Sequence, residues 1–194
     1  MKTGSFEFNV RELAMPTPSD EELMLNVRDG DLAAFEQLVP RRQTEAWRVA
    51  YRFTGDAAEA EDIAQQAFLR ILDAAPRYTP TAAFRTYLYQ VVTRLCLDRH
   101  RKKRPVLAES LPDPAAAAPT PEEHAGARDR DRLIQTALDS LPADHRLAIV
   151  LRYFEGLSGV EMAAAMGRSP KAVERLLARA RAALAPRLEL LREK

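Results

Sequence analysis

The C-terminal third of the sequence contains start and stop signals for two short helices that follow each other closely. Ser158 and Glu161 have the S-x-x-E spacing of a capping box, in which each side chain satisfies a backbone amide at the helix start. Gly167 suits the tight turn after this helix. Ser169 followed by Pro170 is an N-cap with proline at the first helical position. Two capped helices joined by a tight turn favour a helix-turn-helix.

The second of these helices has two different faces. At about 100° per residue, its apolar stripe should pack on the preceding helices; the stripe consists of Val173, Leu176, Leu177, Ala180 and Leu184. The opposite face presents Lys171, Arg175, Ala178, Arg179 and Ala182, with Glu174 at its edge. In helix-turn-helix proteins such a face enters the major groove, where cations reach guanine edges or phosphates. A solvated arginine-rich surface is the alternative, and the turn between two capped helices favours DNA reading.

The charges of the chain are separated along the sequence. The 194 residues are 46% hydrophobic, enough for ordinary cores, and their formal net charge is only +1. A basic run occupies Arg99–Arg104, whereas an acidic cluster consists of Asp56, Glu59, Glu61 and Asp62. One basic and one acidic surface indicate two kinds of partner.

Several classes of protein do not fit this sequence. The only cysteine, Cys96, lies on the apolar stripe of a predicted helix, so we expect a core residue and no disulfide within the chain. His100, His124 and His145 are scattered, and no cluster has metal-ligand spacing. We therefore expect no metal, no cofactor and no catalytic residues. With no apolar run long enough for a signal peptide or membrane span, we expect a cytoplasmic protein without membrane insertion.

The N-terminal half also contains helix signals. Residues 1–18 lack a helical repeat and are expected to form a flexible arm. Ser19 and Glu22 then repeat the S-x-x-E capping box. In the next helical segment, Pro40 is expected to kink or divide the helix because proline lacks an amide hydrogen. Gly55 should end that segment.

A helix capped by Asp56 has a clear 3.6-residue apolar repeat that runs from Ala60 to Ala75. Its outward face combines one leucine with acids and amides: Asp62, Gln65, Gln66, Leu69 and Asp73. An exposed leucine in such surroundings marks either a protein-docking face or an ordinary surface residue, and periodicity alone leaves both open.

The next helix, predicted over Phe84–Arg104, is strongly amphipathic. Its polar face interleaves cations with an aromatic ring and then enters the basic run; it presents Arg85, Tyr89, Gln90, Arg94, Arg99, Arg101 and Lys102. Single-stranded nucleic acid requires charge for its phosphates and flat surfaces for its unstacked bases. A solvated helix with a basic end remains the alternative for this segment.

Residues 105–127 are rich in proline, alanine and acids, without apolar periodicity, and are predicted to be a linker. If largely extended, the linker would span about 70 Å at about 3.1 Å per residue. It separates a domain over 19–104 from a second over 128–190. No strand-like alternation is present, so the predicted fold is all-α: two small helical domains joined by a flexible linker.

Taken together, the two halves resemble bacterial sigma factors of the sigma-70 family, of the compact extracytoplasmic-function (ECF) type. The resemblance covers residues 20–184 and rests on several blocks in the right order. These are GDLAAFEQL, GDAAEAEDIAQQAFLRIL, FRTYLYQVVTRLCLD with its basic run, and LPADHRLAIVLRYFEGLSGVEMAAAMG followed by ARAR. Ordered blocks are more specific than a helix-turn-helix alone.

The resemblance implies a promoter-specificity subunit with no chemistry of its own. The face of Asp62, Gln65, Gln66, Leu69 and Asp73 would dock on the clamp helices of the largest RNA polymerase subunit, and the polymerase flap region would be a further contact. The domain over 19–104 would bind and melt the −10 element with Arg77, Tyr78, Thr79, Arg85, Tyr89, Arg94, Arg99, Arg101 and Lys102. The helix-turn-helix would bind the −35 element with Arg168, Ser169, Lys171, Glu174, Arg175 and Arg179. The linker acids Glu109, Asp113, Glu122 and Glu123 would lie on the path toward the active-site channel, and an anti-sigma factor is an expected partner.

This sequence departs from the family pattern at three positions. Tyr87 and Arg94 stand where relatives often have Trp and Asn, and Leu176 replaces an expected cation of the recognition helix. The family's promoter sequence therefore does not transfer to this chain. Two other binding proteins remain alternatives: a sigma mimic that sequesters an anti-sigma factor, which would not need the basic −10 surface, and a conventional helix-turn-helix regulator bound to operator DNA, which would not need the docking face.

Overall fold

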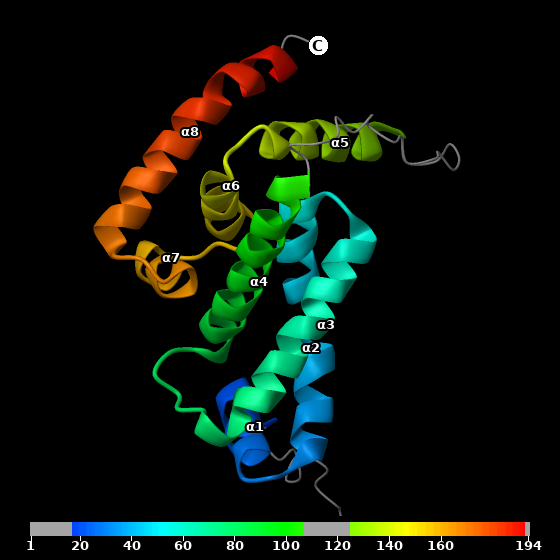
Figure 1. Cartoon of the computed structure of the whole chain (residues 1–194), viewed down its shortest axis with the longest axis vertical. Helices are drawn as coiled ribbons and strands as arrows, with labels where there is room; N and C mark the ends of the chain where they lie inside the picture. Colours follow the sequence, from blue (N-terminus) through cyan, green and yellow to red (C-terminus); the bar gives the residue numbers. More distant parts are fainter. Residues whose placement is uncertain (1–16, 107–124, 193–194) are drawn as a thin grey trace, which may run out of the picture.

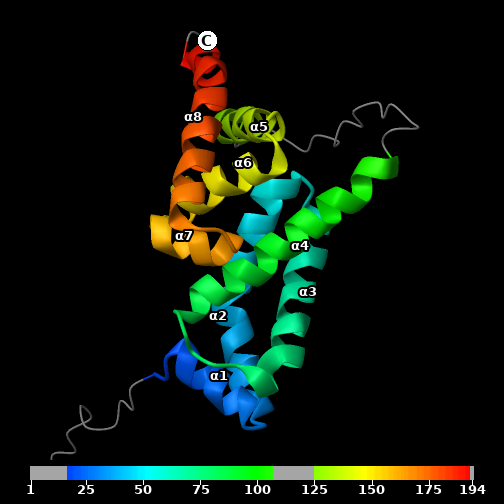
Figure 2. The same cartoon turned by 60° about the vertical axis from the view of Figure 1, so that its left-hand side comes forward.

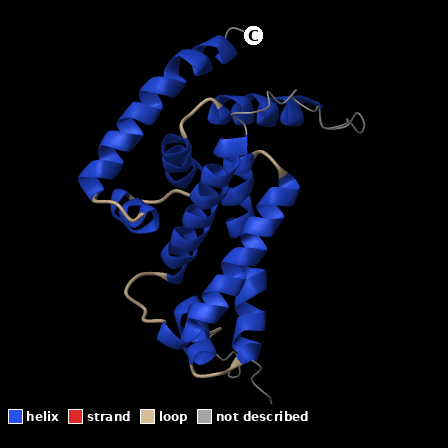
Figure 3. Ribbon diagram, viewed as in Figure 1, coloured by secondary structure: helices blue, strands red, loops and turns tan. Residues whose placement is uncertain are grey.

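The computed structural model describes residues 17–106 and 125–192, and within these ranges every regular element is a helix (Figure 3). The predicted all-α class with two helical domains is confirmed. Most of the predicted arm over 1–18 and of the predicted linker over 105–127, including its four acids, lies outside the described residues.

The helices form two groups along the chain (Figure 1). The N-terminal domain consists of α1 (Asp20–Arg28), α2 (Leu32–Thr54), α3 (Ala57–Ala74), the 3-10 turn η2 (Ala75–Arg77) and α4 (Phe84–Val106). The C-terminal domain consists of α5 (Ala125–Asp139), α6 (Ala143–Ile149), the π-helical turn η3 (Val150–Phe154), α7 (Gly159–Met166) and α8 (Pro170–Arg192). The helix α4 extends two residues into the predicted linker, and the first three residues of α5 lie within the predicted end of the linker.

The helix starts follow the capping signals of the sequence. Both predicted capping boxes form: Ser19 accepts a hydrogen bond from the Glu22 amide, and Ser158 accepts one from the Glu161 amide. The side chain of Asp56 accepts from two amides at the start of α3. Gly55 ends α2 in the left-handed conformation, with φ 72°, which glycine adopts without a steric cost.

Pro40 does not divide its helix, contrary to one of the two expectations for this residue. The helix α2 runs unbroken for 23 residues with Pro40 inside it. Leu38 and Ala46, on either side of Pro40, are both fully buried, and α2 packs against α1 and α3. Burial along the whole length of α2 outweighs the one hydrogen bond that proline removes.

The core of the N-terminal domain lies where α2, α3 and α4 pack together. It includes Ile63, Ile71, Phe84 and Leu88, all fully buried, and the expected core position of Cys96 is confirmed. Burial raises the pKa of the Cys96 thiol, so this side chain stays neutral.

The two domains pack directly against each other, an arrangement that the sequence did not predict. The helix α7 lies on α4, and the C-terminal end of α2 contacts α5 and α6 (Figures 1 and 2). This closed arrangement decides which of the predicted binding residues are accessible.

Candidate functional site

The outward face of α3 is as exposed as the sequence predicted. Asp62, Gln65, Gln66 and Asp73 are exposed, and Leu69 has 61% of its surface accessible. Beside Leu69, a cavity of about 660 Å³ opens between α2 and α3. Its α2 wall, which sequence reasoning missed, consists of Phe35, Val39, Gln43, Thr44 and Trp47. Phe35, Val39 and Trp47 give this wall its apolar surface, so Leu69 forms one side of a groove.

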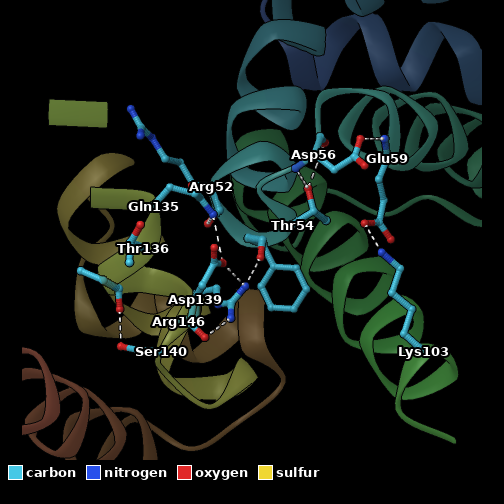
Figure 4. A network of polar contacts seen from close by, with 12 residues as sticks. Arg52, Thr54, Asp56, Glu59, Lys103, Gln135, Thr136, Asp139, Ser140 and Arg146 are labelled. Carbon is cyan, nitrogen blue, oxygen red and sulfur yellow. Dashed lines mark hydrogen bonds and ion pairs between the residues drawn. The ribbon is translucent and has the colours of Figure 1, made fainter. Parts of the chain in front are cut away.

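The acidic start of α3 is paired with the basic end of α4. Lys103 Nζ lies 2.6 Å from Glu59 Oε2 (Figure 4). Arg99 lies 3.7 Å from Asp62 and 3.9 Å from Glu59. Asp62 and Arg99 were assigned to two different partners, and the structure brings them together. In the free chain each neutralises part of the other's charge.

The polar face of α4 is only partly open. Gln90, Arg94, Arg101 and Lys102 are exposed as expected, and Arg101 pairs with Asp98. At the start of this surface, a cavity of about 510 Å³ is lined by the predicted residues Arg77, Tyr78 and Thr79, together with side chains of α4 and Ala164 of α7. Arg77 and Thr79 are exposed at this cavity.

Two tyrosines that the resemblance assigned to the −10 element, Tyr78 and Tyr89, are buried in this arrangement, and the expected exposure of Tyr89 is wrong. Tyr78 is 7% exposed because its ring packs against Tyr87, with 5.6 Å between ring centroids. Tyr89 has no exposed surface: its hydroxyl donates to Glu155 Oε2 of the C-terminal domain at 2.5 Å and lies 3.4 Å from Glu45 of α2. Burial and this hydrogen bond both raise the pKa of Tyr89. Helical periodicity placed Tyr89 on the polar side of α4, but it could not show that α2 and the C-terminal domain enclose this side chain.

Arg85 is half-buried for the same reason. Its guanidinium donates to the backbone carbonyl of Glu155 at 2.7 Å and stacks over the Tyr89 ring at 5.1 Å from the centroid. Two predicted DNA-binding side chains of α4, Arg85 and Tyr89, are thus engaged by one residue of the C-terminal domain.

The helix-turn-helix forms as predicted from α7 and α8. Gly167 makes the turn with φ 60°, and Ser169 Oγ accepts from the Ala172 amide at 3.3 Å. Val173 and Ala180 are buried on the packing stripe. The predicted DNA-binding side chains on the other face are exposed: Arg168, Ser169, Lys171, Glu174, Arg175 and Arg179. Arg168 also pairs with Asp144 at 2.6 Å.

Another apolar groove, which sequence reasoning missed, lies in the C-terminal domain. This cavity of about 430 Å³ lies between α5, η3 and α8. Tyr153 and Phe154 line it with 57% and 39% of their surfaces exposed. The signal in the sequence is a pair of adjacent aromatic residues, Tyr153 and Phe154, at the end of an apolar run.

The described residues contain no group of three or more metal-ligating side chains. Among the same residues, no helix is long and apolar enough to cross a membrane.

Comparison with known families gives two matches that follow the two domains. Residues 38–106 match Sigma-70 region 2, and residues 131–184 match Sigma-70 region 4. Together these ranges cover more than half of the chain. Region 2 thus corresponds to the surfaces on α3 and α4, and region 4 to the helix-turn-helix.

Individual relatives agree with these matches. The chain is 37% identical to the ECF RNA polymerase sigma factor SigE of Mycolicibacterium smegmatis, over 77% of this chain and 62% of that protein. It is 34% identical to the RNA polymerase sigma-H factor of Pseudomonas aeruginosa, over 90% of this chain and 96% of that protein. It is 31% identical to the ECF RNA polymerase sigma factor SigW of Bacillus subtilis, over 84% and 92% of the two chains.

Among solved structures, CnrH in complex with the cytosolic domain of CnrY is similar to this chain. The TM-score is 0.69 at 26% identity, covering 89% of this chain and 99% of CnrH. Members of the sigma-70 family bind core RNA polymerase and promoter DNA. From the two region matches and the relatives of nearly full length, the chain belongs to the ECF group of the sigma-70 family of RNA polymerase sigma factors, which are transcription initiation factors and not enzymes.

Proposed function

We propose that this sigma factor places core polymerase on a two-part promoter, with the α3 face as the polymerase contact, the α4 surface as the −10 reader and α8 as the −35 reader. The observation that carries the proposal is the coexistence of these three surfaces on one chain. A conventional regulator would need only α8, and a sigma mimic would not need the basic α4 surface.

The polymerase contact would combine the α3 face with the groove beside it. Leu69 and the aromatic side chains of α2 supply apolar area, and Asp62, Gln65, Gln66 and Asp73 supply a polar rim. An apolar centre with a polar rim is the usual composition of a protein interface. In our proposal the clamp helices of the largest polymerase subunit occupy this groove.

The −10 element would be opened on the α4 surface. Arg94, Arg101 and Lys102 are exposed and would meet phosphates, Arg101 after breaking its ion pair with Asp98, and the cavity beside Arg77 and Thr79 would receive an extruded base. Extruding a base costs a few kcal/mol of stacking, which contacts in a protein pocket must offset. Because this step only exchanges contacts, the chain would act by binding energy alone.

The −35 element would be read in the major groove by α8. Four cations lie on the exposed turn and helix face: Arg168, Lys171, Arg175 and Arg179. Glu174 on the same face would accept a hydrogen bond from a cytosine amino group. Since Leu176 is half-buried against the core, base choice would depend on Lys171, Glu174, Arg175 and Arg179.

The apolar groove of region 4 would bind the polymerase flap, and an anti-sigma factor would compete for this groove or for the groove beside Leu69. We assign this groove, with Tyr153 and Phe154, to the polymerase flap region during initiation. An anti-sigma factor that covered either apolar groove would compete with polymerase. The complex of the similar protein CnrH with the cytosolic domain of CnrY supports such a partner. All of these partners place the proposed activity in the cytoplasm.

The test is binding of the full chain to core RNA polymerase. We expect Asp62→Lys to weaken this binding at least tenfold, because it places a cation in the polymerase contact. Glu36→Lys, the same charge reversal at an exposed position of α2, is the matched control and should bind as the unchanged chain does. Equal binding by all three proteins would refute the docking face, and failure of the unchanged chain to bind would refute the proposed function.

A further inference from the structure

The carboxylate of Glu155 is the most deeply buried charge at the contact between the two domains. Only 2% of this side chain is exposed, although Glu155 sits in the loop after η3, at the surface of region 4. Its partners all belong to region 2: the Tyr89 hydroxyl at 2.5 Å, Arg85 Nη2 at 3.6 Å and Arg48 Nη2 at 3.6 Å. Since buried carboxylates are costly unless paired, Glu155 depends on region 2 for its partners.

The region 2 side of this contact is connected within itself. Arg85 lies 3.4 Å from Glu45 of α2, and the Tyr89 hydroxyl lies 3.4 Å from the same carboxylate. The backbone carbonyl of Glu155 accepts a further hydrogen bond from Arg85 at 2.7 Å. One loop residue of region 4 therefore joins a network of four side chains from α2 and α4. We call Glu155 and these four side chains the latch: Glu45, Arg48, Arg85 and Tyr89.

Another polar contact holds the domains together at the C-terminal end of α2 (Figure 4). Arg146 donates to the Phe53 carbonyl at 2.5 Å and lies over the Phe53 ring, while Asp139 pairs with the same guanidinium at 2.8 Å. Arg52 pairs with Asp131 at 3.1 Å. These contacts lie at a different part of α2 from the latch. Because region 4 is held at two places on region 2, its orientation relative to region 2 is fixed.

The closed arrangement affects the two DNA surfaces differently. Tyr89 is fully buried between Glu45 of α2 and Glu155 of region 4, Arg85 is half-buried in the same contact, and α7 packs on α4. On α8, in contrast, Lys171, Arg175 and Arg179 all stay exposed. The closed chain thus hides part of the −10 surface while it leaves the −35 surface open.

We propose that the latch is autoinhibitory, because through Glu155 it holds region 4 over the −10 surface until the domains separate on polymerase. The inference rests on the proposed roles of α4 and α8. When the domains separate, water solvates the charges of Glu155 and Arg85. This solvation offsets part of the cost of breaking their contacts, so the closed and open states can interconvert. Losing one hydrogen bond to a charged group changes such an equilibrium about tenfold or more.

The test measures domain separation in the full chain by Förster transfer between dyes at Gln37→Cys and Ala183→Cys. Both positions are exposed, whereas buried Cys96 should not react with the dyes. We expect Glu155→Gln to raise the ratio of open to closed molecules about tenfold, because it removes the charge that faces Arg85 and Arg48. Glu36→Gln, the same change at an exposed position of α2, should leave the transfer unchanged.

The functional arm uses two DNA probes from a mapped promoter: a −10 non-template single strand and a −35 duplex. Glu155→Gln should bind the single strand several-fold more tightly than the unchanged chain and the duplex equally well. Should Glu155→Gln fail to fold, Asp131→Lys breaks the Arg52 pair at a residue with 60% of its side chain exposed, and should shift both readouts in the same direction.

Unchanged transfer in a folded Glu155→Gln chain would overturn the latch, as would opening without any gain in single-strand binding. If the unchanged chain binds neither polymerase nor either DNA probe, the proposed function is overturned instead. In that case the transfer measurement still decides whether Glu155 holds the domains together.

Discussion

The salt dependence of −35 binding should report how many cations of the helix-turn-helix contact phosphates. The exposed turn and outer face of α8 present Arg168, Lys171, Arg175 and Arg179. Each phosphate contact releases condensed counterions, so the logarithm of the affinity falls with the logarithm of salt concentration by about 0.9 per contact. Four contacts predict a slope of about −3.6.

This slope has a large effect over an accessible range. Between about 50 and 200 mM salt the affinity should fall about 150-fold for four contacts, and about 40-fold for three. Arg175→Ala should therefore change the slope from about −3.6 to about −2.7. Because Arg168 is paired with Asp144 in the free chain, its contribution requires that this ion pair break on DNA.

Fluorescence anisotropy of a labelled −35 duplex, titrated with the full chain at several salt concentrations, measures the slope. The matched control is Arg181→Ala, since Arg181 lies at the apolar groove of region 4 and not on the DNA face. Its slope should equal that of the unchanged chain. An affinity independent of salt, or equal slopes for Arg175→Ala and the unchanged chain, would refute the docking of α8 on phosphates.

The remaining predictions concern the α3 helix and the cap formed by Ser158 and Glu161. Leu69→Ala should weaken binding to core polymerase and change the free energy of unfolding by less than about 0.5 kcal/mol, because Leu69 is exposed. Ile63→Ala, at a fully buried position of the same helix, should cost about 2–5 kcal/mol in a urea titration, and equal stability of the two variants would contradict the assignment of the α3 faces. Ser158→Ala should destabilise the helix-turn-helix by about 1 kcal/mol, measured in the same way. The hydrogen bonds from Ser158 lower the pKa of Glu161, so their contribution is present above the unfolded pKa of about 4.3 and is lost as the pH falls through the folded pKa. Thermal unfolding between pH 3 and 6 should show this loss in the unchanged chain and a smaller one in Ser158→Ala.

Local signals in the sequence were enough to predict the helices and their starts. Capping depends on residues three or four positions apart, so Ser19 with Glu22 and Ser158 with Glu161 could be recognised without knowledge of the fold. The same holds for the buried and exposed faces of α3 and α8, which follow from the 3.6-residue repeat. Pro40 shows the limit of a local rule, because packing along α2 overrides the preference of one residue.

Contacts between the domains could not be predicted in this way. Tyr89 lies on the polar side of α4, and nothing within a few residues of it indicates that Glu155, 66 positions later, accepts a hydrogen bond from its hydroxyl. The pairing of Arg99 with Asp62 likewise joins two surfaces that the sequence assigned to separate partners. Such long-range pairs depend on how whole helices pack, which periodicity does not determine.

Initiation by reconstituted polymerase tests the central claim most directly. Core RNA polymerase, the full chain and a library of promoter fragments should give transcripts whose start sites share two upstream elements at a constant spacing, and Arg175→Ala should weaken the dependence on the −35 element while retaining the −10 element. No transcripts above core polymerase alone, or start sites that share no pair of elements, would contradict the account.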